Sequence, residues 1–93
     1  MTYEEEMEKL RREINRLNDE ILDKLAERVE VAVSISAVKR RHGRPIVDRG
    51  REEKVYEQIR RLARERSLDD EGVEQIFREI IRLCTEVQRE SPP

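Results

Sequence analysis

The chain has 93 residues, and 20 Lys and Arg against 22 Asp and Glu leave a net charge of −2 although 45% of the residues are charged. Hydrophobic residues make up 35%, with no Trp and one Phe, which is a small supply of core for a compact monomer of this length. The low net charge and the patterned apolar residues exclude a disordered chain, and no apolar run approaches the ~18 residues of a membrane span. We therefore expect one soluble domain over residues 1–93 that completes its core by oligomerising.

The single cysteine, Cys84, leaves no internal disulfide and no cysteine zinc site, which is typical of the reducing cytoplasm. The acidic start of the chain, Tyr3-Glu4-Glu5-Glu6, is not a signal peptide. The sequence contains no phosphate-binding loop, metal-ligand cluster or acid dyad, and we expect no metal and no cofactor.

Charge is distributed unevenly, because residues 39–66 carry 11 bases against 5 acids while both ends are net acidic. A basic middle could indicate nucleic-acid binding. However, helices rich in Arg and Glu form i,i+4 pairs in solvent, and few aromatic residues are available to stack on bases. We expect neither a nucleic-acid nor a membrane partner.

The first predicted element is a helix from about residue 4 to residue 41. Apolar residues recur there every three or four positions, at Met7, Leu10, Ile14, Leu17, Ile21, Leu25, Val29 or Ala32, Ile35 and Val38. Such a helix is ~57 Å long, whereas a compact chain of this length has a radius of gyration near ~12 Å. It cannot be covered by its own chain and predicts a partner.

Two shorter helices follow a break at residues 42–45, where a glycine and a proline disfavour helix. Asp48 is placed as the N-cap of the second helix, which ends before Ser67, and residues 67–70 contain another capping signal. The apolar face of the second helix carries Val55, Tyr56, Ile59, Leu62 and Ala63. The third helix presents Val73, Ile76, Phe77, Ile80, Ile81, Cys84 and Val87, and ends before residue 91. The prediction is all-α, with three helices and a very long first one.

Several polar residues occupy positions on apolar helix faces. Arg28 and Lys39 share a face of the first helix with Ala32, and Gln88 shares a face of the third with Cys84. A long cation on such a face is costly unless it is paired, although each one alone could extend its charge to solvent. Together they predict a pocket rich in donors, which suits a small dianion because guanidinium grips a carboxylate through two parallel bonds.

Arg11 lies on the same helix, 17 residues before Arg28, which is ~26 Å along the axis. No small metabolite bridges that gap, so Arg11 could join the pocket only from a second chain. Helix length and the position of Arg11 thus both predict an intertwined homodimer with two shared sites.

Residues near the start of the second helix offer further polar groups, with alternatives that stay open. Asp48 could serve only as a cap, and Arg51 and Glu52 could form a solvent-facing pair. His42 is more readily explained as an exposed loop residue than as a catalytic one. Cys84 is most simply a small buried residue, because no base for a thiol nucleophile is evident.

In this order, these residues resemble the all-helical (AroQ-type) chorismate mutases over residues 7–88. The resemblance is carried by Leu10-Arg11, Ile14, Leu17, residues 25–28 (Leu-Ala-Glu-Arg), Lys39, Arg44-Pro45-Ile46, Asp48, Arg51-Glu52 and Gln88. It implies a cytoplasmic homodimer in which each long helix spans both halves. It also implies the Claisen rearrangement of chorismate to prephenate, in phenylalanine and tyrosine biosynthesis.

The resemblance further implies catalytic roles for Arg28, Lys39 and Gln88. Arg28 binds one substrate carboxylate, and Arg11 from the other chain binds the second together with Lys39. Lys39 and Gln88 donate to the ether oxygen as the C–O bond breaks. Such a reaction within one molecule requires no nucleophile, acid–base pair or metal, but it requires a folded conformer and donors aimed at developing charge.

By the same resemblance, Asp48 and Glu52 hold the ring hydroxyl, and Arg51 orients Glu52. Cys84 stands where a small hydroxyl or amide often contacts a carboxylate, and a thiol is a weaker donor. Two alternatives remain: an isochorismate pyruvate lyase of the same fold, and a non-catalytic helical dimer module, which would tolerate substitution of the pocket residues. The set of Asp48, Arg51 and Glu52 favours the mutase.

Overall fold

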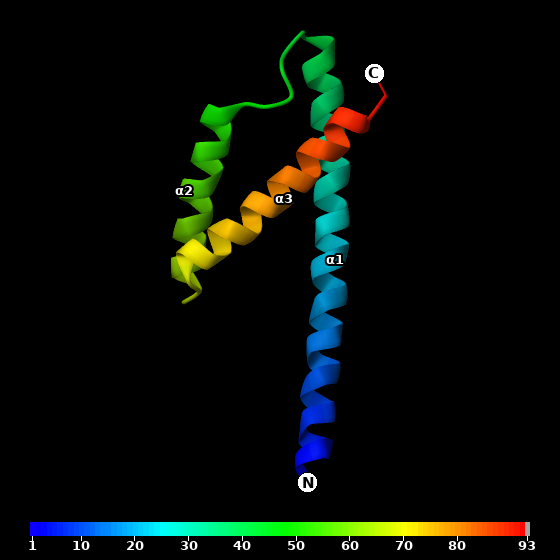
Figure 1. Cartoon of the computed structure of the whole chain (residues 1–93), viewed down its shortest axis with the longest axis vertical. Helices are drawn as coiled ribbons and strands as arrows, with labels where there is room; N and C mark the ends of the chain where they lie inside the picture. The colour runs from blue at the N-terminus through cyan, green and yellow to red at the C-terminus, as the bar shows by residue number, and fades with distance from the viewer. Residues whose placement is uncertain (93) are drawn as a thin grey trace.

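The computed structural model describes residues 1–92 and consists of three α-helices. Helix α1 spans Tyr3–Arg41, α2 spans Arg49–Glu65 and α3 spans Asp70–Glu90, and no described residue lies in a strand. Figure 1 shows α1 as a long rod, with α2 beside its C-terminal half and α3 crossing obliquely from the far end of α2 back to α1. The predicted all-α fold with a very long first helix is confirmed.

Local capping explains where the helices begin. The N-cap of α1 is Thr2, whose side chain accepts the N–H of Glu5. Asp48 caps α2 as predicted, since its Oδ1 accepts the N–H of Arg51 at 3.0 Å. Within the second predicted capping signal, Asp69 is the residue that caps α3. Each cap satisfies a backbone N–H that lacks a partner within the helix.

The connections end the helices in the way that the sequence predicts. Gly43 has φ 63°, a left-handed conformation that suits glycine because it has no Cβ, and His42 beside it is exposed. Ser67, between α2 and α3, also adopts a left-handed φ of 57°. These two turns reverse the chain, so that α3 can return to α1.

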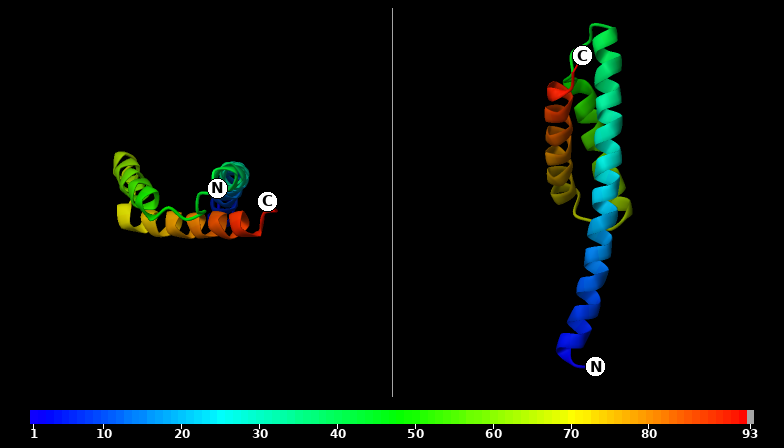
Figure 2. Two further views of the ribbon diagram at one scale, coloured as in Figure 1. Left: turned by 90° about the horizontal axis from the view of Figure 1, so that it is seen from above. Right: turned by 90° about the vertical axis from the view of Figure 1, so that its right-hand side faces the viewer.

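Helix α3 packs against both other helices, whereas within residues 1–92 no Cα atom of α1 lies within 8 Å of one of α2. The buried residues are correspondingly few: Ala32 and Ser36 on α1, Tyr56 and Ala63 on α2, and Cys84 and Gln88 on α3. Seen from above in Figure 2, α1 and α2 lie on the same side of α3. The core is therefore two thin seams along α3.

Ion pairs reinforce the seam between α2 and α3. Glu74 accepts hydrogen bonds from Arg60 of α2 and Arg78 of α3, and these bonds hold its pKa below the ordinary value of 4.5. A hydrogen bond from Arg64 lowers the pKa of Asp70 in the same way. The guanidinium of Arg78 also lies 4.1 Å from the ring centroid of Tyr56. These contacts join α2 to the N-terminal half of α3.

The N-terminal half of α1 extends away from the other helices. Four of its apolar residues are between 41% and 63% exposed: Leu10, Ile14, Leu17 and Ile21. The molecule measures 61 × 28 × 15 Å and has a radius of gyration of 17.4 Å, well above the ~12 Å of a compact chain of this length. The prediction that the chain cannot cover its own first helix is confirmed.

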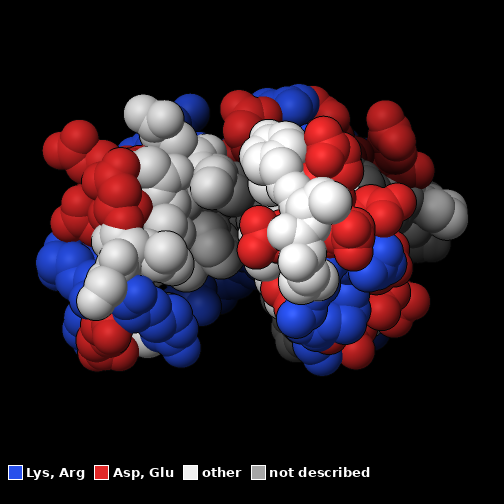
Figure 3. Space-filling view, turned by 90° about the horizontal axis from the view of Figure 1, so that it is seen from below, with Lys and Arg blue, Asp and Glu red and all other residues white. Residues whose placement is uncertain are grey.

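An apolar groove continues this uncovered surface between α1 and α3. Its apolar lining comes from Leu17, Ile21 and Leu25 of α1 and from Ile76, Phe77 and Ile80 of α3. In Figure 3, seen from below, uncharged side chains gather on the two sides that face each other across a recess, and charged side chains cover much of the outer surface. None of the described helices is both long and apolar enough to cross a membrane.

Candidate active site

A cavity of about 400 Å³ opens between the C-terminal half of α1, the start of α2 and the end of α3. Seven of the eight residues proposed from the sequence line it: Arg28, Lys39, Asp48, Arg51, Glu52, Cys84 and Gln88. Apolar walls are supplied by Val31, Ala32, Ile35, Val55 and Ile81. The fold thus brings polar groups that are up to 60 residues apart in sequence to one cavity.

Arg28 is half-buried, and its Nη1 donates to the Sγ of Cys84 at 3.1 Å across the α1–α3 seam. Cys84 is only 4% exposed, which confirms the expectation of a small buried residue. It also has a second role, because its sulfur is the acceptor that orients the Arg28 guanidinium. Since sulfur is a weak acceptor and guanidinium has five N–H groups, the arginine retains donors for a ligand.

Lys39 is half-buried, and its Nζ donates to the backbone oxygen of Ile46 at 2.6 Å. The backbone oxygen of Lys39 in turn accepts the N–H of Arg44 at 2.8 Å. Both ends of the residue therefore hold the connection between α1 and α2. An ammonium has three protons, so two remain for a ligand in the cavity.

Gln88 is 8% exposed, and its Nε2 donates to the backbone oxygen of Ala32 at 2.8 Å. The small side chains of Ala32 and Ser36 lie at the crossing and allow α3 to approach the α1 backbone closely. The carboxamide keeps one N–H, because the bond to Ala32 uses only one of its two. Gln88 is thus buried and bonded to α1, although it lies in the last turn of α3.

The start of α2 contributes the acidic side of the cavity. Asp48 both caps the helix and lines the cavity, so its role as a cap does not remove it from the site. Glu52 is half-buried and forms no hydrogen bond or ion pair through its carboxylate with any residue in 1–92. It therefore forms no pair with the side chain of Arg51, one of the alternatives that the sequence left open, since successive helix residues point in different directions. Arg51 instead donates its backbone N–H to Asp48.

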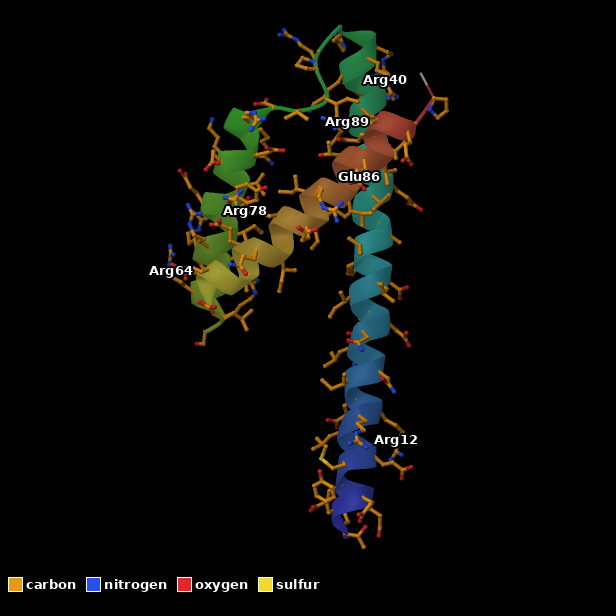
Figure 4. All side chains as sticks on the ribbon, viewed as in Figure 1. Arg12, Arg40, Arg64, Arg78, Glu86 and Arg89 are labelled. Atoms are coloured by element: carbon orange, nitrogen blue, oxygen red, sulfur yellow. The ribbon has the colours of Figure 1, made fainter. Side chains whose placement is uncertain are left out.

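Arg11 is the one proposed residue outside this cavity. It is exposed on the N-terminal half of α1, 17 residues from Arg28, or ~26 Å along the helix. Figure 4 shows this part of α1, with the neighbouring Arg12 labelled, far from α2 and α3. The chain does not bring its own Arg11 to its own cavity, as the sequence predicts.

Two contributors to the site were missed in the sequence. The carbonyl of Ile46 that holds Lys39 leaves no side-chain signal, because any residue could supply it. Arg40 donates to the backbone oxygen of Gln88, and its only sequence signal is a cation near the end of the long helix.

Comparison with known proteins gives the family. Residues 10–89 match the family Chorismate mutase type II. The chain is 36% identical over 88 residues to a bifunctional chorismate mutase/prephenate dehydratase of Aquifex aeolicus, covering 91% of this chain and 24% of that protein. It is 30% identical over 86 residues to a chorismate mutase of Methanocaldococcus jannaschii, and the match covers 92% of this chain and 87% of that protein. It is also 32% identical over 85 residues to a 4-amino-4-deoxychorismate mutase of Streptomyces venezuelae, and the match covers 90% of this chain and 82% of that protein.

The chain therefore spans about a quarter of the bifunctional relative and most of the length of the other two. The family match extends through all three helices and through every residue that lines the cavity. It confirms the resemblance first noted from the sequence: this all-helical chain belongs to the chorismate mutase type II family.

Proposed function

We propose that this chain catalyses the reaction for which its family is named, the rearrangement of chorismate to prephenate in phenylalanine and tyrosine biosynthesis. One observation carries the proposal beyond family membership. Donors from two helices, on Arg28, Lys39 and Gln88, line one cavity of about 400 Å³ that also has apolar walls and, at the start of α2, two carboxylates. A small substrate with two carboxylates and an ether oxygen matches this arrangement.

The substrate is held by its carboxylates and reacts without leaving the cavity. Arg28 grips one carboxylate through parallel N–H bonds, with the guanidinium oriented by Cys84. One C–O bond breaks and one C–C bond forms in a cyclic shift of electron pairs, and no proton is transferred. The protein accelerates this step by restricting the substrate to its folded conformer.

The ether oxygen gains negative charge as the C–O bond breaks. The free protons of Lys39 and the free N–H of Gln88 donate to it, and both groups are already held in place by the backbone oxygens of Ile46 and Ala32. Donors that are already in place need not move during the reaction, and each one stabilises the transition state by about 3 kcal/mol. The carboxylates of Asp48 and Glu52 accept the hydrogen bond that the ring hydroxyl donates at the other end of the substrate.

We propose that two chains form an intertwined dimer in which the N-terminal half of each α1 packs on the other chain. Two apolar surfaces support this assembly: the exposed stripe of Leu10, Ile14, Leu17 and Ile21 on α1, and the groove between α1 and α3. Each could pack against the apolar surface of a second copy. Full burial of one such side chain is worth about 1.5–3 kcal/mol. The dimer would also bring Arg11 to the partner's cavity as the ligand for the second carboxylate.

Turnover is tested by adding the protein to chorismate, following the loss of its ultraviolet absorbance and identifying prephenate by chromatography. Arg28→Ala and Lys39→Ala should each abolish most activity while the helical circular-dichroism signal is retained. Lys54→Ala is the matched control, because Lys54 is exposed on α2 and does not line the cavity. A wild-type rate in Lys39→Ala would refute the mechanism.

The shared site is tested by mixing two inactive variants, Arg11→Ala and Arg28→Ala. In a mixed dimer, one cavity receives an intact Arg28 from its own chain and an intact Arg11 from the partner. Equal mixing should therefore restore about a quarter of the wild-type activity. If Arg11 acted within its own chain, no mixed dimer would hold a complete site and mixing would restore nothing.

A second candidate substrate is 4-amino-4-deoxychorismate, the compound in the name of the Streptomyces relative. The carboxylate of Glu52, which pairs with no group among residues 1–92, favours it, since an ammonium would attract this charge more than a hydroxyl does. If both substrates react, Glu52→Gln should lower kcat/KM more for the amino compound. Pyruvate release from isochorismate, without prephenate formation, would instead support the lyase alternative.

A further inference from the structure

Gln88 lies in a part of α3 whose backbone hydrogen bonding is interrupted by the sequence. In a continuing helix its carbonyl would accept the N–H of residue 92, but that residue is Pro92, which has no N–H. The preceding carbonyl, of Val87, accepts both the N–H of Ser91 at 3.0 Å and its hydroxyl at 2.9 Å. The helix itself therefore leaves the carbonyl of Gln88 without a donor.

A side chain from α1 supplies that donor. Nη2 of Arg40 donates to the Gln88 oxygen at 2.6 Å, and Nη1 of the same guanidinium donates to the oxygen of Pro92 at 3.1 Å. Arg40 is half-buried, and Figure 4 shows it on α1 close to where α3 ends. A planar guanidinium with two bonds holds its acceptors in a defined geometry. Its charge also suits the negative end of the helix dipole.

We propose that Arg40 is a positioning residue for Gln88. It takes the place of the N–H that Pro92 lacks and fixes the last turn of α3 against α1. The carboxamide of Gln88 then keeps its bond to Ala32 and directs its free N–H into the cavity. This inference rests on the proposed function, because it concerns the donor to the reacting ether oxygen.

Neighbouring cations do not duplicate this role. Lys39, one residue earlier, bonds to Ile46 and lines the cavity. Arg41, one residue later, is exposed and makes no side-chain hydrogen bond within residues 1–92. Arg89, on the last turn of α3 itself, does not bond the Gln88 carbonyl. Among the described side chains, Arg40 alone donates to this oxygen.

The test compares Arg40→Met, which keeps the length of the stem but removes the donors, with Arg41→Met as the matched control. For Arg40→Met we expect kcat with chorismate to fall roughly 10- to 100-fold, the scale of a misplaced catalytic group. KM should change by less than about threefold, since the carboxylate ligands are untouched. Arg41→Met should match the wild type in both constants.

A double-mutant cycle separates positioning from general stabilisation. In a Gln88→Ala background Arg40→Met should cause no further loss of kcat, because the group that it positions is gone. A conservative variant gives the rescue: Arg40→Lys keeps a donor on a long stem and should recover part of the kcat that Arg40→Met loses. It also supplies the measurement if Arg40→Met alone melts below the assay temperature.

The inference is overturned if folded Arg40→Met keeps the wild-type kcat, if it loses the same factor with and without Gln88, or if Arg40→Lys is as slow as Arg40→Met. Its failure is distinguishable from failure of the proposed function. If the wild type forms no prephenate, the proposed function is wrong. If the wild type is active and Lys39→Ala is not, but Arg40→Met is unaffected, only the role of Arg40 is wrong.

Discussion

Replacing Gln88 with glutamate tests whether the donor at the breaking ether bond must carry a proton. The carboxamide is neutral and should donate at any pH at which the protein is folded. Gln88→Glu keeps the size and shape of the side chain but makes the donor titratable. Below the pKa of the new carboxyl the group can still donate, and above that pKa it can only accept.

The structure sets the direction and size of the effect. Position 88 is 8% exposed, and its terminal nitrogen lies 2.8 Å from the carbonyl oxygen of Ala32. An ionised carboxylate there would be poorly solvated and would face another acceptor, so its pKa should rise above the ordinary value of a glutamate side chain. Loss of one preorganised donor costs roughly 10²- to 10³-fold in kcat. We expect Gln88→Glu to be slower than the wild type by that factor at pH 8 and to recover on acidification.

The assay is kcat/KM for chorismate between about pH 5 and pH 9, with circular dichroism recorded at each pH to establish that the chain is folded. Gln88→Met is the control, since it fills similar space without a donor and should be slow throughout. The reasoning would be refuted if Gln88→Glu matched the wild type at pH 8. It would also be refuted if the folded variant stayed as slow as Gln88→Met at pH 5.

Three further predictions concern the thiol, a turn and an ion pair. Cys84→Ser should leave kcat/KM unchanged or raise it by up to about tenfold, because a hydroxyl is a stronger partner than sulfur for Arg28, and a loss measured in the chorismate assay would contradict this. Gly43→Ala should lower the free energy of unfolding by about 1–2 kcal/mol in urea titrations, because φ is 63° although space for a Cβ is open; an unchanged free energy would contradict the strain. Hydrogen bonds from Arg60 and Arg78 lower the folded-state pKa of Glu74 below 4.5. The stability that these bonds contribute is therefore full above pH 4.5 and is lost as pH falls through the folded-state pKa. The thermal unfolding midpoint should therefore fall less with acidification in Glu74→Gln than in the wild type. Equal falls in the two proteins would show that Glu74 does not cause the acid dependence of stability.

The helices could be predicted from the sequence because their causes are local. Each cause acts within one or two helical turns: the apolar residues that recur every three or four positions, the cap at Asp48 and the break at Gly43. The predicted bounds of α1 differ from Tyr3–Arg41 by one residue at its start. The exposed apolar stripe on α1 was predictable as well, because the predicted helix is longer than a compact chain of this length is wide.

The cavity could be predicted in part, because a polar residue on an apolar face is visible in the sequence. This pattern marked Arg28, Lys39 and Gln88, and the fold places all three along one cavity. The residues at the start of α2 stood out only as polar groups without an assigned role, and the family resemblance implied their roles. The pattern could not show whether Asp48 does more than cap, or that Arg51 and Glu52 do not pair.

What each group bonds to was decided by the tertiary structure alone. Arg28 meets Cys84, Gln88 meets Ala32 and Arg40 meets the Gln88 carbonyl across 48 to 56 residues of sequence. Periodicity tells which face of a helix is apolar, but it contains no information on how far α3 slides along α1 or at what angle the two cross. Those two quantities depend on the small residues at the crossing and on the turns before α3, and they select the atoms that come within hydrogen-bonding distance.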